Sequence, residues 1–210
     1  RPKRHMTIRD LLSHMSGLTY DFMYKSNVDA AYRKTKLQQA DSLEEMVNIL
    51  AGLPLEFSPG DEWNYSVSTD VLGYLVEVLS GMKLDEYFKK NIFEPLDMVD
   101  TDFSCPEEKK DRLAALYEHD PKGDPRLLEI PFLNTKMLSG GGGLFSTMSD
   151  YYNFCSMIIG QGEFNGKRLI GRKTIELMSC NHLPDGQDLT EMSKSAFSET
   201  PFAGVGFGLG

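Results

Sequence analysis

A tyrosine followed by small hydroxyl residues is the part of this sequence best suited to chemistry. Tyr65 comes after a Ser58-Pro59-Gly60 turn signal, and Ser66 and Ser68 open the apolar helical stretch behind it. This arrangement holds a phenol at a helix N-terminus, where the helix dipole and unpaired N–H groups favour negative charge. A free phenol has a pKa of about 10, so ionising it near pH 7 costs about 4 kcal/mol. A nearby ammonium group is the natural source of that stabilisation.

Two serines elsewhere could be read as nucleophiles, and their spacing argues against both. His14 and Ser16 lie two residues apart, and residues at that spacing on a helix do not face each other. Ser80 and Lys83 form the one Ser-x-x-Lys match in the sequence. Gly81 stops the helix directly after Ser80, whereas a nucleophile needs a helix N-terminus whose N–H groups can form an oxyanion hole. We therefore expect neither serine to be the nucleophile.

The glycine run from Gly140 to Gly143 could be read as a phosphate-binding loop. It lacks the Lys-Ser/Thr pair that follows a P-loop, and no clear strand precedes it. A turn at the rim of a pocket, where positive φ or close backbone approach is needed, fits the run better. We expect no cofactor.

Composition narrows the classes of partner. The 210 residues carry a formal net charge of −9 and lack the basic stripe that neutralises phosphates, so we expect no nucleic acid partner. The four histidines and three cysteines have no metal-like spacing, which predicts neither a metal site nor a disulfide framework. No run of 18 apolar residues occurs, so this segment contains no expected membrane span. A small-molecule substrate is the expected partner.

Helix signals dominate the chain, so we expect helices to position Tyr65 and the other candidate site residues. Capping boxes begin at Thr7 and Ser42, and Thr147 opens a third apolar stripe in the same way. The expected helices run from Ile8 to a stop at Gly17, from Leu43 to Gly52, from after Tyr65 to Gly81, from Leu84 to Phe93, from Met148 to Gly160, and from Arg172 to Ser179.

Strand signals are few. The stretches 114–119 and 126–130 flank a Pro-Lys-Gly-Asp turn, which predicts a small hairpin. Residues 204–210 alternate small and apolar side chains, as at the start of a buried strand. We therefore expect residues 1–201 to form a helical domain with a hairpin. Residues 202–210 would begin the sheet of a second, α/β domain whose remainder lies outside the chain.

Four blocks along the chain resemble signatures of one family of serine hydrolases. They are Leu11-Leu12-Ser13-His14-Met15-Ser16-Gly17-Leu18, the residues around Tyr65, Phe93-Glu94-Pro95-Leu96-Asp97-Met98, and Gly142 to Thr147 followed by Asp150-Tyr151. In order and rough spacing the blocks resemble the serine β-lactamase and penicillin-binding-protein family, and more narrowly its β-lactamase-like esterases. Asp97 replaces the usual Gly. The resemblance implies an α+β, β-lactamase/transpeptidase-like fold, with this chain mainly its helical domain.

The resemblance also implies roles for residues. Tyr65 would be the general base for a nucleophilic serine, and the segment with His14 and Ser16 would be structural. The ammonium group would be the lysine of a Ser-x-x-Lys motif, which we expect upstream of Arg1. A third motif, of the Trp-Gly-Gly or Lys-Thr-Gly type, would lie downstream of Gly210. The chain alone is therefore expected to be inactive.

Two positions that the resemblance assigns to substrate binding depart from the β-lactamase pattern. Val67 stands where β-lactamases usually carry Asn, which donates a hydrogen bond to the amide carbonyl of a β-lactam side chain; Val cannot donate one. Gly142 lies roughly where class C β-lactamases place an aromatic wall, which implies a more open pocket. Both departures favour a lipophilic ester over a β-lactam.

These features lead to a main hypothesis and two alternatives. The main hypothesis is a serine hydrolase that forms an acyl-enzyme on carboxylic esters, with β-lactam hydrolysis weak or absent. One alternative is a catalytically inactive, penicillin-binding-like scaffold, for which Val67 is the one hint. The other is a true class C-like β-lactamase or D-Ala-D-Ala peptidase. A Ser-x-x-Lys motif a few tens of residues before Leu11 would separate an active enzyme from a scaffold.

Overall fold

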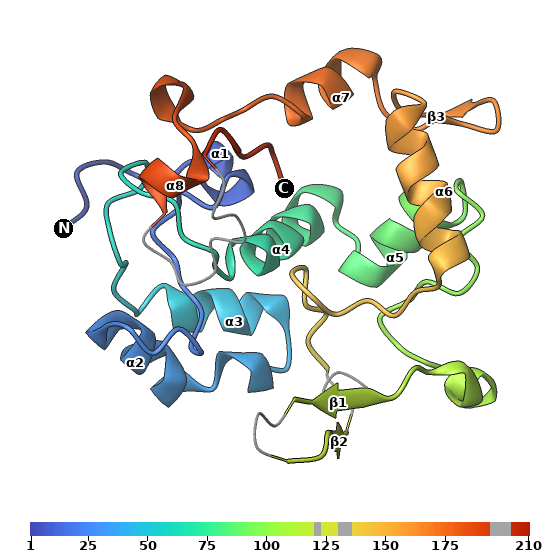
Figure 1. Ribbon diagram of the computed structural model, residues 1–210, viewed down its shortest axis with the longest axis horizontal. Coiled ribbons are helices and arrows are strands. Elements are labelled where there is room, and N and C mark those ends of the chain that lie inside the picture. The colour runs from blue at the N-terminus through green and yellow to red at the C-terminus, as the bar shows by residue number, and fades with distance from the viewer. Residues whose placement is uncertain (120–122, 130–135, 194–202) are drawn as a thin grey trace.

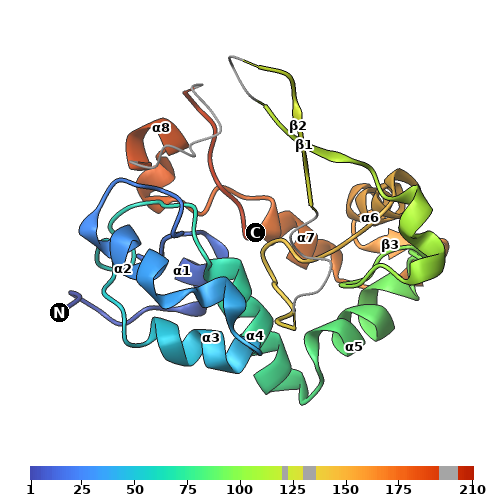
Figure 2. The same cartoon turned by 90° about the horizontal axis from the view of Figure 1, so that it is seen from below.

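The computed structural model describes residues 1–119, 123–129, 136–193 and 203–210. Within them, helices form most of the regular structure and the strands form short hairpins. Figures 1 and 2 show two groups of elements: α1 to α4 with α8, and α5 to α7 with β3. The α-helices are α1 (Ile8–Leu12), α2 (Asn27–Thr35), α3 (Leu43–Leu50), α4 (Ser68–Ser80), α5 (Leu84–Phe88), α6 (Met148–Ile159), α7 (Arg172–Met178) and α8 (Leu189–Met192). The 3-10 helices are η1 (Leu37–Gln39), η3 (Glu107–Arg112) and η4 (Pro184–Gly186).

Side-chain caps start α1, α3 and α6, as the sequence predicts. The Thr7 hydroxyl accepts a hydrogen bond from the backbone N–H of Asp10, and the Asp10 carboxylate accepts one from the N–H of Thr7. Ser42 and Thr147 each accept from the N–H three residues further on. These contacts pair helix N–H groups that have no partner inside the helix.

Helices α2 and α8 are absent from the sequence prediction, although each begins with a capping box. Ser26 and Asp29 exchange hydrogen bonds at the start of α2, and Asp188 and Glu191 do so at the start of α8. The local start signal was therefore present. Neither segment carries the long apolar stripe on which the other predictions depended.

Helix α1 is shorter than predicted, because it ends at Leu12 instead of running towards Gly17. His14 has a φ of 55°, in the left-handed region that cannot continue a right-handed helix. The segment 14–18 is therefore free to run beside another part of the chain. Further along, α4 ends at Gly81 as predicted, with that glycine in the left-handed conformation. The helix expected over 84–93 starts as α5 and continues as the π-helix η2 (Lys89–Phe93).

Two antiparallel hairpins are present among the described residues. Strand β1 (Leu116–Glu118) pairs with β2 (Arg126–Leu128), with Leu116 opposite Leu128, which confirms the predicted hairpin. Pro121, Lys122 and Ile130, which belonged to that prediction, lie outside the described residues.

The second hairpin joins β3 (Glu163–Phe164) and β4 (Lys167–Arg168). Its turn is Asn165-Gly166, both at positive φ, which is the strongest short-range hairpin signal in a sequence and was missed.

Residues 203–210 pair with no strand among the described residues, and the strand that the sequence predicts there stays a prediction, because its partner strands are expected outside the chain. Their backbone instead bonds to the segment between α7 and α8: Leu189 N–H donates to the Val205 carbonyl, and Leu209 N–H to the Met178 carbonyl. A Cβ on Gly208 would lie 2.4 Å from the Met178 carbonyl oxygen. The small residues of the tail therefore permit close backbone packing. The predicted division of the chain into two domains at residue 201 stays a prediction.

Tyr65 lies where two clusters of apolar side chains meet. One cluster includes buried residues of α2, α3 and the start of α4. The other joins Met15, Trp63, Leu183, Leu189 and Met192 near α8. A separate cluster packs α6 and α7 against Phe93, Leu96 and Met98. Since the Tyr65 ring packs against the first two clusters, its backbone position is fixed from both sides.

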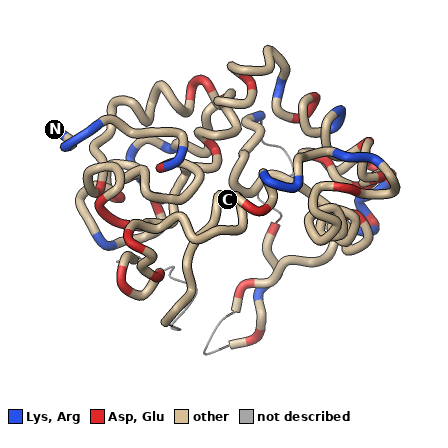
Figure 3. The backbone as a smooth tube through the Cα atoms, turned by 90° about the horizontal axis from the view of Figure 1, so that it is seen from above, with Lys and Arg blue, Asp and Glu red and all other residues tan. Residues whose placement is uncertain are grey.

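The surface carries both signs of charge. Figure 3 shows Lys and Arg interspersed with Asp and Glu along the backbone, with no long basic stripe on the described elements. Among the same residues, no helix combines the length and apolar character needed to cross a bilayer.

Candidate active site

The segment that carries Tyr65 is bound by hydrogen bonds to residues 14–18. The N–H of Gly60 donates to the Met15 carbonyl at 2.9 Å, and the N–H of Asn64 donates to the His14 carbonyl at 3.0 Å. The Asn64 side-chain amide donates to the Leu18 carbonyl at 2.9 Å. The left-handed turn at His14, just after the end of α1, thus places residues 14–18 where the Tyr65 segment can bond to them.

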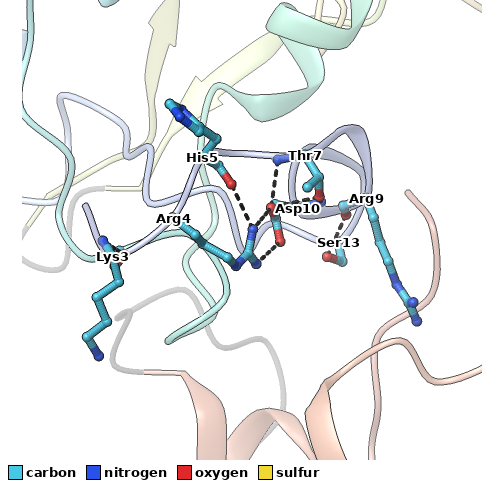
Figure 4. A network of polar contacts seen from close by, with 8 residues as sticks. Lys3, Arg4, His5, Thr7, Arg9, Asp10 and Ser13 are labelled. Atoms are coloured by element: carbon cyan, nitrogen blue, oxygen red, sulfur yellow. Dashed lines mark hydrogen bonds and ion pairs between the residues drawn. The ribbon is translucent and has the colours of Figure 1, made fainter. Parts of the chain in front are cut away.

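An ion pair at the N-terminus holds the turn before Tyr65. Figure 4 shows the Arg4 guanidinium donating to both oxygens of Asp10, each at 2.7 Å. Burial would raise the pKa of Asp10, but hydrogen bonds from Arg4 and Thr7 outweigh it and hold that pKa below its usual range. A Cβ on Gly60 would lie 2.2 Å from Arg4 Nη2, so the guanidinium crosses the turn directly over this glycine.

The three site residues that the sequence predicts, Tyr65, Val67 and Gly142, line one cavity of about 530 Å³. A Cβ on Gly142 would meet no atom within 4 Å, which agrees with the open pocket that its lack of a side chain implies. Much of the remaining wall is apolar. Its apolar side chains are Phe22, Leu37, Met46, Val67 and Met137. The structure therefore brings together three positions that the sequence identified separately.

The Tyr65 ring lies between two other rings. The centroid of Tyr20 is 5.1 Å away and that of His14 is 5.2 Å away. Burial raises the pKa of Tyr20, and the charge of Asp70 raises it further, so Tyr20 stays a neutral phenol. Burial lowers the pKa of His14 to about 4, so this imidazole is neutral at pH 7. Neither ring neighbour thus supplies the positive charge that would favour a Tyr65 phenolate.

The two serines that sequence spacing argued against are not placed for nucleophilic attack. Ser16 is fully buried, and its hydroxyl lies 2.7 Å from that of Ser68. Ser80 ends α4, where its hydroxyl donates to the Val76 carbonyl, and Lys83 pairs with Glu77 instead of Ser80. Neither serine lines the cavity.

Ser66 adjoins Tyr65 and contacts a histidine, but it has the surroundings of a structural residue. His14 Nδ1 lies 3.2 Å from Ser66 Oγ, which in turn lies 2.7 Å from Ser68 Oγ. Both serines are fully buried, and His14 is nearly so. This chain of hydroxyls extends to Ser16 and connects the start of α4 to the segment 14–18. The geometry agrees with the structural role expected for His14 and Ser16.

The sequence missed three residues that surround the cavity: Tyr20, Asp70 and Ser139. Asp70 accepts a hydrogen bond from Ser139, which is 69 positions away in the sequence. Burial raises the pKa of Asp70, against the opposing effect of hydrogen bonds from Ser139 and from glycines of the 140–143 run. Only the position of Asp70 in the first turn of α4, the helix that follows Tyr65, could have drawn attention to it.

No metal centre is evident in the described part of the chain, where His, Cys, Asp and Glu form no group suited to an ion. Cys105, Cys155 and Cys180 are free thiols.

Comparison with known proteins identifies the family of the chain. The sequence matches the family described as Beta-lactamase over residues 1–209. The chain belongs to the beta-lactamase family. An uncharacterized protein of Mycobacterium tuberculosis is 33% identical over 216 residues, which cover 99% of this chain and 51% of the relative. Lovastatin esterase of Penicillium rubens is 29% identical, over 100% of this chain and 54% of its own length.

Among solved structures, "EstCE1, a hydrolase with promiscuous acyltransferase activity" matches with a TM-score of 0.74 and 26% identity. That match covers 97% of this chain and 55% of EstCE1. The β-lactamase/transpeptidase-like fold predicted from the sequence is thereby confirmed. The chain spans about half the length of the curated relatives it matches, 51% and 54% in the two cases above. The relatives and structural neighbours named above include an esterase and a hydrolase.

Proposed function

We propose that the full-length protein is a serine hydrolase that cleaves carboxylic esters through an acyl-enzyme, with Tyr65 as general base. The observation that carries this proposal is the position of Tyr65 on the wall of a largely apolar cavity of about 530 Å³. Val67 and Gly142 share that wall, so one space would receive both the base and the substrate.

The proposed reaction has two half-steps that share one base. In the first, Tyr65 accepts the proton of a nucleophilic serine while that serine attacks the ester carbonyl carbon. The tetrahedral intermediate collapses, and Tyr65 returns the proton to the leaving alcohol. In the second, Tyr65 accepts a proton from water while the water oxygen attacks the acyl-serine carbonyl carbon. Tyr65 then returns that proton to the departing serine oxygen, which releases the acid and the free serine.

The nucleophile and its lysine are proposed to come from a Ser-x-x-Lys motif outside residues 1–210. The surroundings of Tyr65 support this division. Its ring neighbours Tyr20 and His14 are uncharged at pH 7, so neither of them supplies the cation that would ionise the phenol. A lysine one helical turn after the nucleophile would meet that need.

Esters fit this cavity better than β-lactams do. Val67 is buried in the wall and offers no hydrogen bond to an amide carbonyl. The open space beside Gly142 and the apolar lining suit a lipophilic acyl or alcohol group. The relative named lovastatin esterase is consistent with ester chemistry in this family.

The proposal is tested with Tyr65→Phe in the full-length protein. Loss of a general base should lower kcat/KM on p-nitrophenyl esters by about 10²- to 10⁴-fold. Tyr151→Phe is the matched control, because this tyrosine lies exposed on α6. A Tyr65→Phe rate within about tenfold of the wild type would contradict the role of Tyr65 as base.

A fluorophosphonate probe locates the nucleophile independently. Peptide mapping of the labelled full-length protein should place one adduct on a serine outside residues 1–210. An adduct on Ser66 or Ser80 would overturn the placement of the nucleophile outside residues 1–210. Labelling of no serine, together with no ester hydrolysis, would favour an inactive scaffold.

A further inference from the structure

Asp70 connects helix α4 to the glycine run across the cavity. It is the third residue of α4, only 5% exposed, and it lines the cavity. Its Oδ1 accepts a hydrogen bond from the Ser139 hydroxyl at 2.6 Å and another from the Gly141 N–H at 3.3 Å. The carboxylate thus binds both a side chain and the backbone of the opposite segment.

The first two residues of the glycine run, Gly140 and Gly141, lie close against the first turn of α4. A Cβ on Gly140 would lie 2.4 Å from the Thr69 carbonyl oxygen. A Cβ on Gly141 would lie 3.0 Å from Thr69 Oγ1 and 3.1 Å from Asp70 Oδ2. At Gly142 the surroundings change, since a Cβ there would meet nothing within 4 Å. The run is therefore clamped at 140 and 141 and opens into the cavity at 142.

We propose that Asp70 is a positioning residue that holds Ser139 to Gly142 as one wall of the cavity and thereby sets which acyl groups fit. This inference deepens the proposed function and rests on it, because the acyl group is that of the ester substrate. Asp70 lies in the first turn of α4, and Tyr65 lies in the segment just before that helix. Because Tyr65 and the Ser139–Gly142 wall line the same cavity, a shift of the wall changes the space in front of Tyr65.

Asp150 offers a matched control on another helix. It too is the third residue of its helix, is buried, and accepts hydrogen bonds from a hydroxyl and a backbone N–H. Its donors are Thr101 Oγ1 at 2.8 Å and the Asp100 N–H at 2.7 Å. Asp150 does not line the 530 Å³ cavity. Loss of Asp150 therefore reports what a buried helix-start carboxylate contributes to folding alone.

The experiment compares Asp70→Ala with Asp150→Ala in the full-length protein. The milder pair Ser139→Ala and Thr101→Val removes only the hydroxyl donors and is used where an alanine at the aspartate prevents folding. Two quantities are measured: amide hydrogen exchange in the peptide spanning residues 139–143, and the ratio of kcat/KM for p-nitrophenyl octanoate over acetate.

Loss of Asp70 should raise exchange in residues 139–143 at least severalfold. It should also lower the octanoate-to-acetate ratio by about tenfold, since one methylene in an apolar pocket is worth about 10- to 200-fold in discrimination. The Asp150 variant should leave both quantities near wild type.

Unchanged exchange in the Asp70 variant, or equal changes in both variants, would overturn the positioning role. Faster exchange with an unchanged ester ratio would overturn the role in acyl selection. A wild-type protein that hydrolyses neither ester would instead overturn the proposed function, while the exchange measurement would still decide whether Asp70 holds the wall.

Discussion

Helices α4 and α6 begin with the same buried carboxylate and differ in what surrounds it. In both, the third residue is an aspartate that accepts hydrogen bonds from a distant hydroxyl and a distant N–H. Helix α6 has Thr147 as a side-chain cap, with extended backbone at φ −116° and ψ 162°. Helix α4 starts at Val67, which provides no side-chain cap.

The difference indicates what each helix start is adapted to do. At α6 the Thr147 hydroxyl caps the helix from extended backbone, and the Asp150 carboxylate fixes the segment at Asp100 and Thr101. At α4 a valine occupies the cap position, the aspartate has a raised pKa because of burial, and both line a cavity beside Tyr65. Departures from local rules are expected at functional sites, where stability is given up for geometry.

The largest expected contrast between the two helix starts is in how far the free energy of unfolding falls in acid. His14 contacts Ser66 next to the start of α4, and burial lowers its pKa to about 4. The folded state therefore holds His14 neutral, while the unfolded chain binds a proton below about pH 6.5. The resulting stability is complete above that pH and is lost as the pH falls to about 4. The loss amounts to about 3 kcal/mol.

Urea unfolding of His14→Asn against the wild type at pH 7 and pH 4.5 tests this contrast. Asn tolerates the positive φ at position 14 and does not titrate, so its free energy of unfolding should fall less in acid. His5→Asn, at an exposed histidine, is the control and should behave as the wild type does. Equal acid sensitivity of the His14 variant and the wild type would contradict the prediction.

A smaller effect is expected from adding a methyl group to the glycine wall. Gly140→Ala would place Cβ 2.4 Å from the Thr69 carbonyl, and overpacking of this kind costs about 1–3 kcal/mol. Gly142→Ala should change the free energy of unfolding by less than about 0.5 kcal/mol, because its Cβ would enter open space. Neither glycine has a positive φ, so backbone strain does not confound the comparison. A destabilising Gly142→Ala would show that the wall is packed closely throughout.

The helix starts could be predicted from sequence because their signals are local. The Thr7, Ser42 and Thr147 caps each act within three residues, and all three helices begin where expected. The end of α1 at Leu12, which was predicted wrongly, and the path of residues 203–210 depend on contacts with distant parts of the chain. A one-dimensional pattern does not reveal such contacts.

The candidate site divides in the same way. Tyr65, Val67 and Gly142 were identified by comparison of motifs, and the cavity brings them together, although their roles stay predictions. Asp70 and Ser139 were missed because their meaning comes from a contact between residues 69 positions apart. Their residue types are ordinary ones for a helix start and a turn, so local chemistry gave no reason to single them out.

The smallest expected effect tests the caps themselves. Thr147→Ala should cost about 1 kcal/mol of stability, the usual value for loss of a side-chain cap. The reverse change at α4, Val67→Thr, should give no gain, because a side-chain cap needs extended backbone and Val67 has φ −65° and ψ 15°.

The threonine hydroxyl would also replace a methyl group that packs in the core. Thermal unfolding of the two variants measures the difference. If Val67→Thr raised the free energy of unfolding by as much as Thr147→Ala lowers it, α4 would merely lack an ordinary cap. No gain would mean that the backbone at Val67 is shaped by the cavity it lines, at the expense of the helix that begins there.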